Sequence, residues 1–195
     1  MPLAPAREPA VVILAGGDAS RFPGKLESDA GGLPLLVRVY RNVRDVGPVF
    51  VSANARSERL ARTLDCTIVT DREPGRGPLG GLVSAFESIP QTRCFVVAGD
   101  APLIDRDTFS ELAAAWDDRR DAVIAERGGR IEPLCAIYRR EPFLRAARAE
   151  LDNGSASVRA VAEKLAHVRV PLHDERVLAS INTPADRAAL FGVHA

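Results

Sequence analysis

Two cations follow a pair of glycines near the start of the chain, a spacing that suits phosphate binding. The apolar run 11–15 ends at Gly16 and Gly17, and Arg21 and Lys25 follow within a small, polar segment. Glycines let main-chain N–H groups approach a ligand closely, and successive N–H groups can form an anion-binding concavity. Arginine and lysine add full positive charges for phosphate oxygens. The loop therefore predicts a site for a nucleoside triphosphate.

Lys25 is unusual in a chain that strongly prefers arginine. Of the 26 cationic residues, only Lys25 and Lys164 are lysines. Lysine is a compact point charge on a flexible stem, whereas arginine is a planar fork. A lysine retained inside the glycine loop favours a point charge directed at phosphates. An ordinary exposed loop lysine is the alternative.

Polar side chains also follow the next three apolar segments. They are Asn54 after 49–53, Asp71 after 66–70 and Asp100 after 94–98. In an open parallel sheet the carboxyl ends of the strands form one ligand-binding edge, so we expect these side chains to converge there. A carboxylate such as Asp100 beside phosphate oxygens suits Mg²⁺, which would neutralise charge as a bond to phosphorus forms. Each of the three side chains could instead cap its own turn.

A second glycine-rich stretch, 75–81, opens a predicted helix. Its backbone could lie against a base or ribose, which makes Gly81 a candidate nucleotide contact. Close packing of the helix on the sheet at Gly80 and Gly81 explains the same glycines without a ligand.

Apolar strand-like segments alternate with amphipathic helical ones along the chain. The predicted strands are 11–15, 49–53, 66–70, 94–98, 122–125, 131–138 and 168–171. The predicted helices are 33–46, 57–64, 79–89, 105–116, 142–151, 155–166 and 184–190. This alternation predicts an α/β fold of three layers with a mostly parallel sheet, and a hairpin at Gly128 and Gly129 adds an antiparallel strand. We expect a disordered lead-in over 1–10 and a single domain over 11–191.

Composition narrows the class of protein. The 195 residues carry a formal net charge of zero, with 46% hydrophobic and 27% charged residues, as expected of a globular enzyme-sized domain. No basic stripe indicates nucleic-acid binding and no apolar run is long enough to span a membrane. The N-terminal segment does not resemble a secretory signal. Three widely spaced cysteines, Cys66, Cys94 and Cys135, are expected to be buried, reduced thiols in a cytoplasmic protein.

Four motifs in register resemble those of the molybdenum cofactor guanylyltransferase family, within the nucleotidyltransferase superfamily. They are Leu14-Ala15-Gly16-Gly17 with Arg21 and Lys25, Gly77-Pro78-Leu79-Gly80-Gly81, Gly99-Asp100-Ala101-Pro102, and Ile181-Asn182-Thr183-Pro184. The resemblance extends from about Val11 to Leu190. It implies a Rossmann-like nucleotidyltransferase fold and transfer of GMP from Mg·GTP to the phosphate of the molybdopterin cofactor, with release of pyrophosphate.

The resemblance also implies roles for individual residues. Arg21, Lys25 and Asp100 would be catalytic, Asp100 would bind Mg²⁺, and Asn182 would lie on the acceptor side. The GTP contacts would be Leu14, Ala15, Gly16, Gly17, Lys25, Asn54, Asp71, Gly81 and Asp100. Since the acceptor phosphate is already an anion, catalysis would depend on positioning and charge stabilisation rather than on a general base. The histidines, including His167 and His173, lie outside the motifs.

Some positions depart from the family pattern, and the specificity has alternatives. The stretch from Leu14 to Lys25 is about two residues short, and Ser180 stands where a second Asn is common. Glu132 stands where His is common and would place a negative charge near an anionic acceptor. Gly16 replaces the Ala of related cytidylyltransferases and so favours a purine. The alternatives are CTP, another phosphorylated acceptor, or a non-catalytic nucleotide-binding module; the sequence leaves open whether a partner protein delivers the acceptor through a transient contact.

Overall fold

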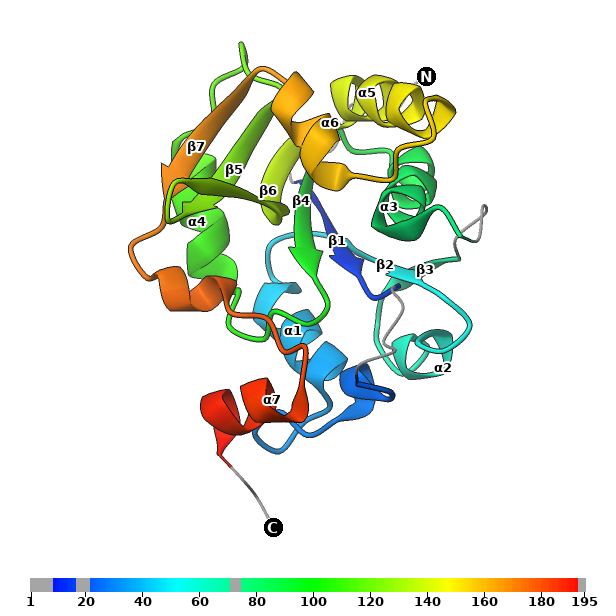
Figure 1. Cartoon of the computed structure of the whole chain (residues 1–195), viewed down its shortest axis with the longest axis vertical. Coiled ribbons are helices and arrows are strands. Elements are labelled where there is room, and N and C mark those ends of the chain that lie inside the picture. Colours follow the sequence, from blue (N-terminus) through cyan, green and yellow to red (C-terminus); the bar gives the residue numbers. More distant parts are fainter. Residues whose placement is uncertain (1–8, 17–21, 71–74, 193–195) are drawn as a thin grey trace.

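A computed structural model describes residues 9–16, 22–70 and 75–192, and within them seven strands form one sheet (Figure 1). The strand order is β3-β2-β1-β4-β6-β5-β7. The strands are β1 (Ala10–Leu14), β2 (Val49–Ala53), β3 (Thr67–Thr70), β4 (Arg93–Ala98), β5 (Ala122–Arg127), β6 (Arg130–Arg139) and β7 (His167–Pro171). All neighbours are parallel except β6, which runs antiparallel to β4 and β5. The predicted α/β class with one antiparallel strand is confirmed.

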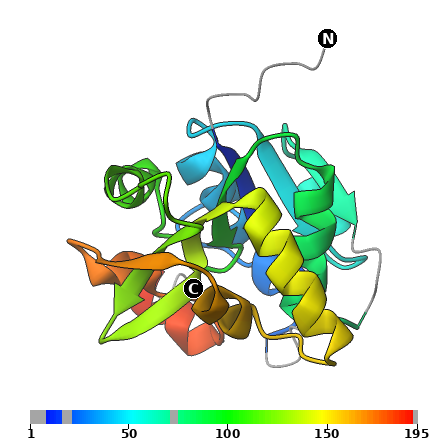
Figure 2. The ribbon, with the colours of Figure 1, turned by 90° about the horizontal axis from the view of Figure 1, so that it is seen from above.

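Helices cover both faces of the sheet, as the alternating pattern predicts. They are α1 (Leu35–Val43), α2 (Glu58–Ala61), α3 (Gly77–Ser88), α4 (Arg106–Ala114), α5 (Arg140–Asp152), α6 (Val158–Lys164) and α7 (Pro184–Phe191), with 3-10 turns η1 (Lys25–Glu27) and η2 (Glu175–Leu178). One apolar core lies between the sheet and α3, α5 and α6, and a second lies beneath α1, α2 and α4. Figure 2 shows α3 and α5 side by side on one face. Strand β1 is buried along its whole length because it contributes to both cores.

Several boundaries differ from the predicted ones for local reasons. Helix α1 begins at Leu35 because Pro34 is extended and disfavours helical backbone at Leu33. Helix α4 begins one residue later than predicted, because Asp105 is its cap and forms a capping box with Thr108. The 3-10 turns η1 and η2 were not predicted, since turns of three or four residues leave no periodic pattern to read.

The hairpin between β5 and β6 has the predicted turn and an unpredicted bulge. Gly128 and Gly129 both have positive φ, 56° and 76°, as a tight two-residue hairpin requires. Ile124 faces Ala136, but the next residue of β5, Ala125, faces Glu132. Residues 133–135 of β6 therefore have no partner in β5 and form a β-bulge.

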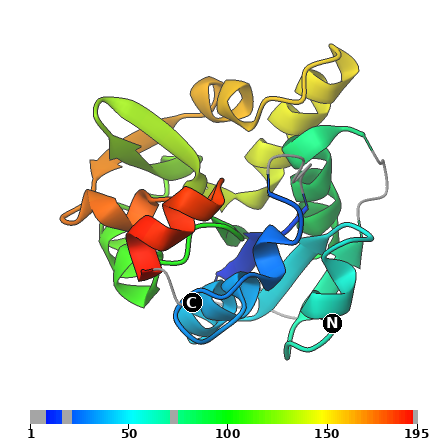
Figure 3. The same cartoon turned by 60° about the horizontal axis from the view of Figure 1, so that its bottom comes forward.

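A small apolar cluster joins the C-terminal helix to the segment that follows the glycine loop. Ala30, Leu35 and Ile181 are fully buried there, and Leu190 and Phe191 of α7 pack against them. Figure 3 shows α7 beside η1 and α1 at this end of the molecule. In the part of the chain that the structure describes, no helix has the length and apolar character to cross a membrane.

Candidate functional site

Gly99 brings the ends of β1 and β4 together at the carboxyl edge of the sheet. Its N–H donates to the Leu14 carbonyl over 2.9 Å. A Cβ on Gly99 would lie only 2.9 Å from that carbonyl oxygen and 3.4 Å from Cα of Ala15. Glycine is therefore required by this backbone contact, which fixes Asp100 directly beside the loop that follows β1.

Three segments distant in sequence meet at Lys25. The Lys25 Nζ donates to Asp100 Oδ2 over 2.6 Å and to Asn182 Oδ1 over 3.5 Å. The side chains of Lys25 and Asp100 are only 16% and 22% exposed, so this ion pair is partly shielded from water. The structure thus brings together the predicted cation, the predicted metal ligand and the predicted acceptor-side amide.

Asn182 is held from several directions. The Ile181 N–H donates to the Asp100 carbonyl over 2.9 Å, which ties this segment to the end of β4. The Asn182 N–H donates to Asp186 Oδ2 over 2.9 Å, and its side-chain amide donates to Ser180 Oγ over 3.2 Å. The hydrogen bond from the Asn182 N–H is the main cause of the lowered pKa of Asp186, and the hydrogen bond with the Thr183 side chain is the second. Asp186 forms a capping box with Thr183, which caps the N-terminus of α7.

Lys25 is positioned by the short turn η1. Gly24, with a φ of 70°, precedes this turn, and the Ser28 hydroxyl donates to the Lys25 carbonyl over 2.7 Å. Phe22 and Leu26 flank Lys25 and pack into the apolar cluster under α7. The cluster therefore anchors Lys25 on the same side of the site as Asn182.

The other predicted nucleotide contacts are distributed around this edge. Leu14 and Ala15 are buried at the end of β1, while Gly16 is half-buried. A Cβ on Gly16 would meet nothing closer than 3.9 Å, so packing within the protein does not demand glycine there. Gly17, Arg21 and Asp71 lie outside the described residues, and their roles stay predictions.

Asn54 and Gly81 have clear structural roles. The Asn54 side-chain oxygen accepts from the N–H groups of Arg56 and Ser57, so Asn54 holds its own turn. A Cβ on buried Gly81 would lie 2.6 Å from Ser52 Oγ and 3.3 Å from Leu14 Cδ1. The glycine therefore allows close packing of α3 on the sheet, and its contact with GTP remains a prediction.

Asp100 also lines a cavity of about 440 Å³, and Lys25 is not part of the cavity wall. Its wall is mostly apolar. The lining residues are Pro78, Ala98, Asp100, Ala101, Ile104, Glu132, Pro133, Leu134, Cys135, Ala156, Ser157, Val158, Arg159, Leu178 and Ser180. The bulge in β6 supplies Pro133, Leu134 and Cys135, so this irregularity shapes the cavity.

Sequence reasoning missed Arg159, and it did not foresee that a cation pairs with Glu132. Arg159, at the start of α6, is half-buried in the cavity wall. The sequence feature that could have pointed to it is its position just after Ser157, which caps α6. The carboxylate of Glu132 is compensated because Arg127 Nη2 lies 3.3 Å from its Oε1.

The cysteines offer no nucleophile here. Burial raises the pKa of the Cys135 thiol, with Glu132 adding to the effect, and burial raises the pKa of Cys94 to about 12. Both thiols are therefore neutral at physiological pH. All three described cysteines are free, as predicted, but Cys66 is only half-buried.

Solved structures show the class to which this fold belongs. A nucleotidyl transferase from Methanothermobacter thermautotrophicus superimposes with a TM-score of 0.76 at 16% identity, covering 95% of this chain and 96% of that one. The molybdopterin-guanine dinucleotide biosynthesis protein A from Archaeoglobus fulgidus also gives 0.76, at 22% identity over 93% and 96% of the two chains. The fold is that of a nucleotidyltransferase.

Sequence comparison then defines the family. Residues 11–170 match the MobA-like NTP transferase domain. A probable molybdenum cofactor guanylyltransferase of Natronomonas pharaonis is 31% identical over 90% of this chain and 93% of its own length. Another from Carboxydothermus hydrogenoformans is 28% identical over 94% and 95% of the two chains. The chain belongs to the MobA-like NTP transferase family, which confirms the resemblance found in its motifs.

Proposed function

We propose that this nucleotidyltransferase moves GMP from Mg·GTP to the phosphate of molybdopterin and releases pyrophosphate. The observation that carries the proposal is the double position of Asp100. Its carboxylate accepts from Lys25 on the nucleotide side and also lines the 440 Å³ cavity. Two substrates could therefore meet at one carboxylate. The names of the relatives supply the choice of guanine and of molybdopterin.

Lys25 would hold the triphosphate. Its ammonium is partly shielded from water, which strengthens its attraction for phosphate oxygens, and it sits at the carboxyl edge where the glycine loop leaves β1. Arg21 would add a second charge from the same loop. The acceptor phosphate needs no general base, so the enzyme would contribute positioning and charge stabilisation.

The donor groups at this point fit a magnesium ion. Asp100 Oδ2 and Asn182 Oδ1 both face the Lys25 ammonium, so two oxygen atoms from separate segments already converge on one positive charge. Magnesium commonly takes one or two protein carboxylates and completes its shell with phosphate oxygens and water. Asp100 and Asn182 would hold Mg²⁺, which would neutralise charge on the phosphates.

The cavity suits a ring system that carries a phosphate. Its apolar wall, rich in proline, leucine and alanine, would cover a flat heterocycle, and Arg159 would face the anionic group. The side chain of Arg159 has no hydrogen bond or ion pair with any residue in the described ranges. This guanidinium therefore remains available to a phosphate.

Turnover with labelled substrates tests the proposal. The protein is incubated with Mg²⁺, molybdopterin and either α-labelled GTP or α-labelled CTP, and pyrophosphate release and dinucleotide formation are followed. We expect GTP to be consumed only when molybdopterin is present, and the Asp100→Asn variant to be folded but inactive. Preference for CTP would contradict the base, and GTP consumption with another phosphorylated acceptor alone would contradict molybdopterin.

A further inference from the structure

The charges in the cavity wall are unevenly compensated. Three lining residues are charged: Asp100, Glu132 and Arg159. Asp100 pairs with Lys25 at 2.6 Å, and Glu132 pairs with Arg127 at 3.3 Å; neither cation is itself part of the wall. Since each carboxylate of the described wall pairs with a cation, the charge that remains in this wall is the positive charge of Arg159.

The hairpin register explains why Arg127 reaches Glu132. Arg127 faces Arg130 and Ala125 faces Glu132 across the two strands. Arg127 and Glu132 are therefore diagonal neighbours on one face of the hairpin, at a spacing that long side chains span.

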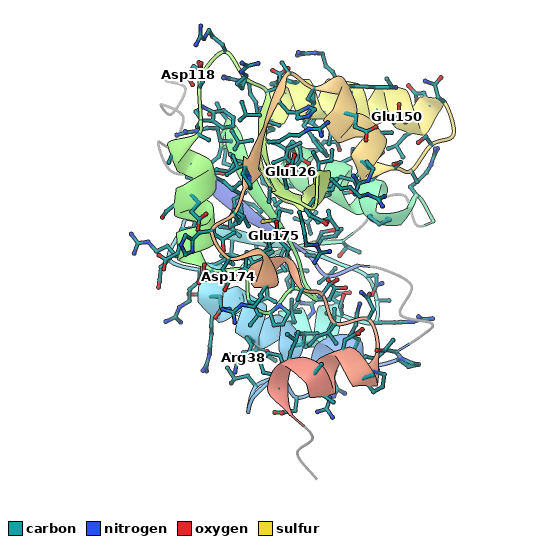
Figure 4. All side chains as sticks on the ribbon, turned by 60° about the vertical axis from the view of Figure 1, so that its left-hand side comes forward. Arg38, Asp118, Glu126, Glu150, Asp174 and Glu175 are labelled. Carbon is teal, nitrogen blue, oxygen red and sulfur yellow. The ribbon has the colours of Figure 1, made fainter. Side chains whose placement is uncertain are left out.

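Arg127 also contacts the C-terminal segment. Its Nη1 donates to the Leu178 carbonyl over 3.2 Å at the end of η2. Leu178 and Ser180 line the cavity. Figure 4 shows Glu126, which precedes Arg127, above Glu175 of η2, so the hairpin end and this turn are neighbours. One guanidinium thus contacts both the carboxylate and the segment that leads to Asn182.

We propose that Arg127 is a positioning residue for the acceptor, because it cancels the charge of Glu132 and so keeps the cavity receptive to an anion. The identity of that anion as molybdopterin rests on the proposed function. Without Arg127, Glu132 would stand uncompensated in the same wall as Arg159 and would both repel the acceptor phosphate and compete for Arg159. The nucleotide side would be unaffected, since Glu132 is not part of the Lys25 cluster.

Steady-state kinetics of matched variants separate this electrostatic role from a structural one. Arg127→Gln keeps a hydrogen-bond donor for Leu178 but removes the charge, and should raise the acceptor KM at least about fivefold while leaving the GTP KM unchanged. Adding Glu132→Gln should return the acceptor KM to the wild-type value, and Arg127→Lys alone should keep the acceptor KM close to that value. Failure of the double variant to recover would mean that Arg127 acts through Leu178 and would overturn the proposal.

A neighbouring ion pair provides the control. Arg169 of β7 lies 3.9 Å from Glu126, and the exposed fractions of these side chains, 49% and 26%, are close to the 44% and 30% of Arg127 and Glu132. This pair does not line the cavity. Arg169→Gln should therefore behave as wild type, and an equal rise in its acceptor KM would contradict the argument.

Binding of inorganic phosphate tests the inference independently of the proposed reaction. Calorimetric titration of the full-length chain should show a phosphate site that Arg159→Met removes, that Arg127→Gln weakens, and that the Arg127→Gln/Glu132→Gln variant recovers. If wild type binds phosphate in this way but does not react GTP with molybdopterin, the proposed function fails and the inference stands. Phosphate binding that is absent, or unaffected by Arg127→Gln, overturns the inference whatever the turnover.

Discussion

Replacement of Gly99 by alanine tests whether the contact between β1 and β4 builds the site. Neither Gly99 nor Gly16 has a positive φ, so alanine can adopt the backbone conformation at both positions. At Gly99 the new Cβ would lie 2.9 Å from the Leu14 carbonyl oxygen, and other backbone atoms surround it. Backbone held by strand hydrogen bonds cannot rotate away as a flexible side chain could. The strand ends must therefore separate.

The expected cost follows from two opposing effects. Inserting a methyl group into a filled space costs typically about 1–3 kcal/mol. Replacing glycine with alanine also restricts the unfolded chain, which stabilises the folded protein by roughly 0.4–1 kcal/mol. With the middle of each range, the net loss for Gly99→Ala is about 1.3 kcal/mol, or a melting temperature lower by about 3–5 °C for a chain of this length. Displacement of Asp100 should also lower kcat.

The matched control is Gly16→Ala at the same edge of the sheet. Its Cβ would meet nothing closer than 3.9 Å, so only the gain from restricting the unfolded chain remains, and stability should rise by roughly 0.4–1 kcal/mol. Urea unfolding of both variants, followed by far-UV circular dichroism, measures the difference. An unchanged midpoint for Gly99→Ala, or an equal loss for Gly16→Ala, would refute the packing argument. If Gly16 faces the base, this stable variant should still bind GTP more weakly than wild type.

Three further predictions concern charge and thiol chemistry. Lys25→Arg should lower kcat/KM for GTP at least about tenfold in a folded protein, because a planar fork replaces a point charge; kinetics with purified variant check this. Since the pKa of Asp186 is lowered in the folded state, its ionised carboxylate stabilises the protein above the usual carboxyl range, and this contribution is lost as pH falls through the folded-state pKa. The Asp186→Asn variant should therefore be less stable than wild type at pH 7. In thermal melts its stability should also depend less on pH below about pH 4. Iodoacetamide at pH 8 should modify Cys66 faster than Cys94, whose raised pKa and burial both suppress the thiolate, and peptide mass spectrometry distinguishes them; equal rates would contradict this.

The parallel part of the fold was predictable because its pattern is strong. Strands such as β1 and β2 are short, apolar runs buried on both faces, and the intervening amphipathic segments place their apolar stripes on the sheet. The bulge in β6 was not predictable. It depends on a register set jointly by β4 and β5, and a single strand sequence does not reveal which of its residues find partners.

In the candidate site, the residues that could be predicted either follow a strand or belong to a recognised motif, and the others could not be predicted. Asp100 could be placed because the end of an apolar strand defines a known edge of the sheet. Arg127 and Arg159 could not, because each belongs to a chain rich in arginine and is distinguished only by what faces it in space. The same holds for Glu132. Its negative charge counts against an anionic acceptor unless its pairing with Arg127 is known, and the sequence does not reveal that pairing.

The C-terminal segment reaches the candidate site although Asn182 lies 157 residues from Lys25 in the sequence. Ile181 fills the apolar cluster beneath η1, and its N–H fixes the chain to the Asp100 carbonyl. The same short stretch presents Asn182 to Lys25 and Ser180 to the cavity. Its neighbour Leu178 accepts from Arg127. The Lys25 cluster and the cavity wall therefore both depend on where this one segment packs, and in the proposed function that packing would align the nucleotide with the acceptor.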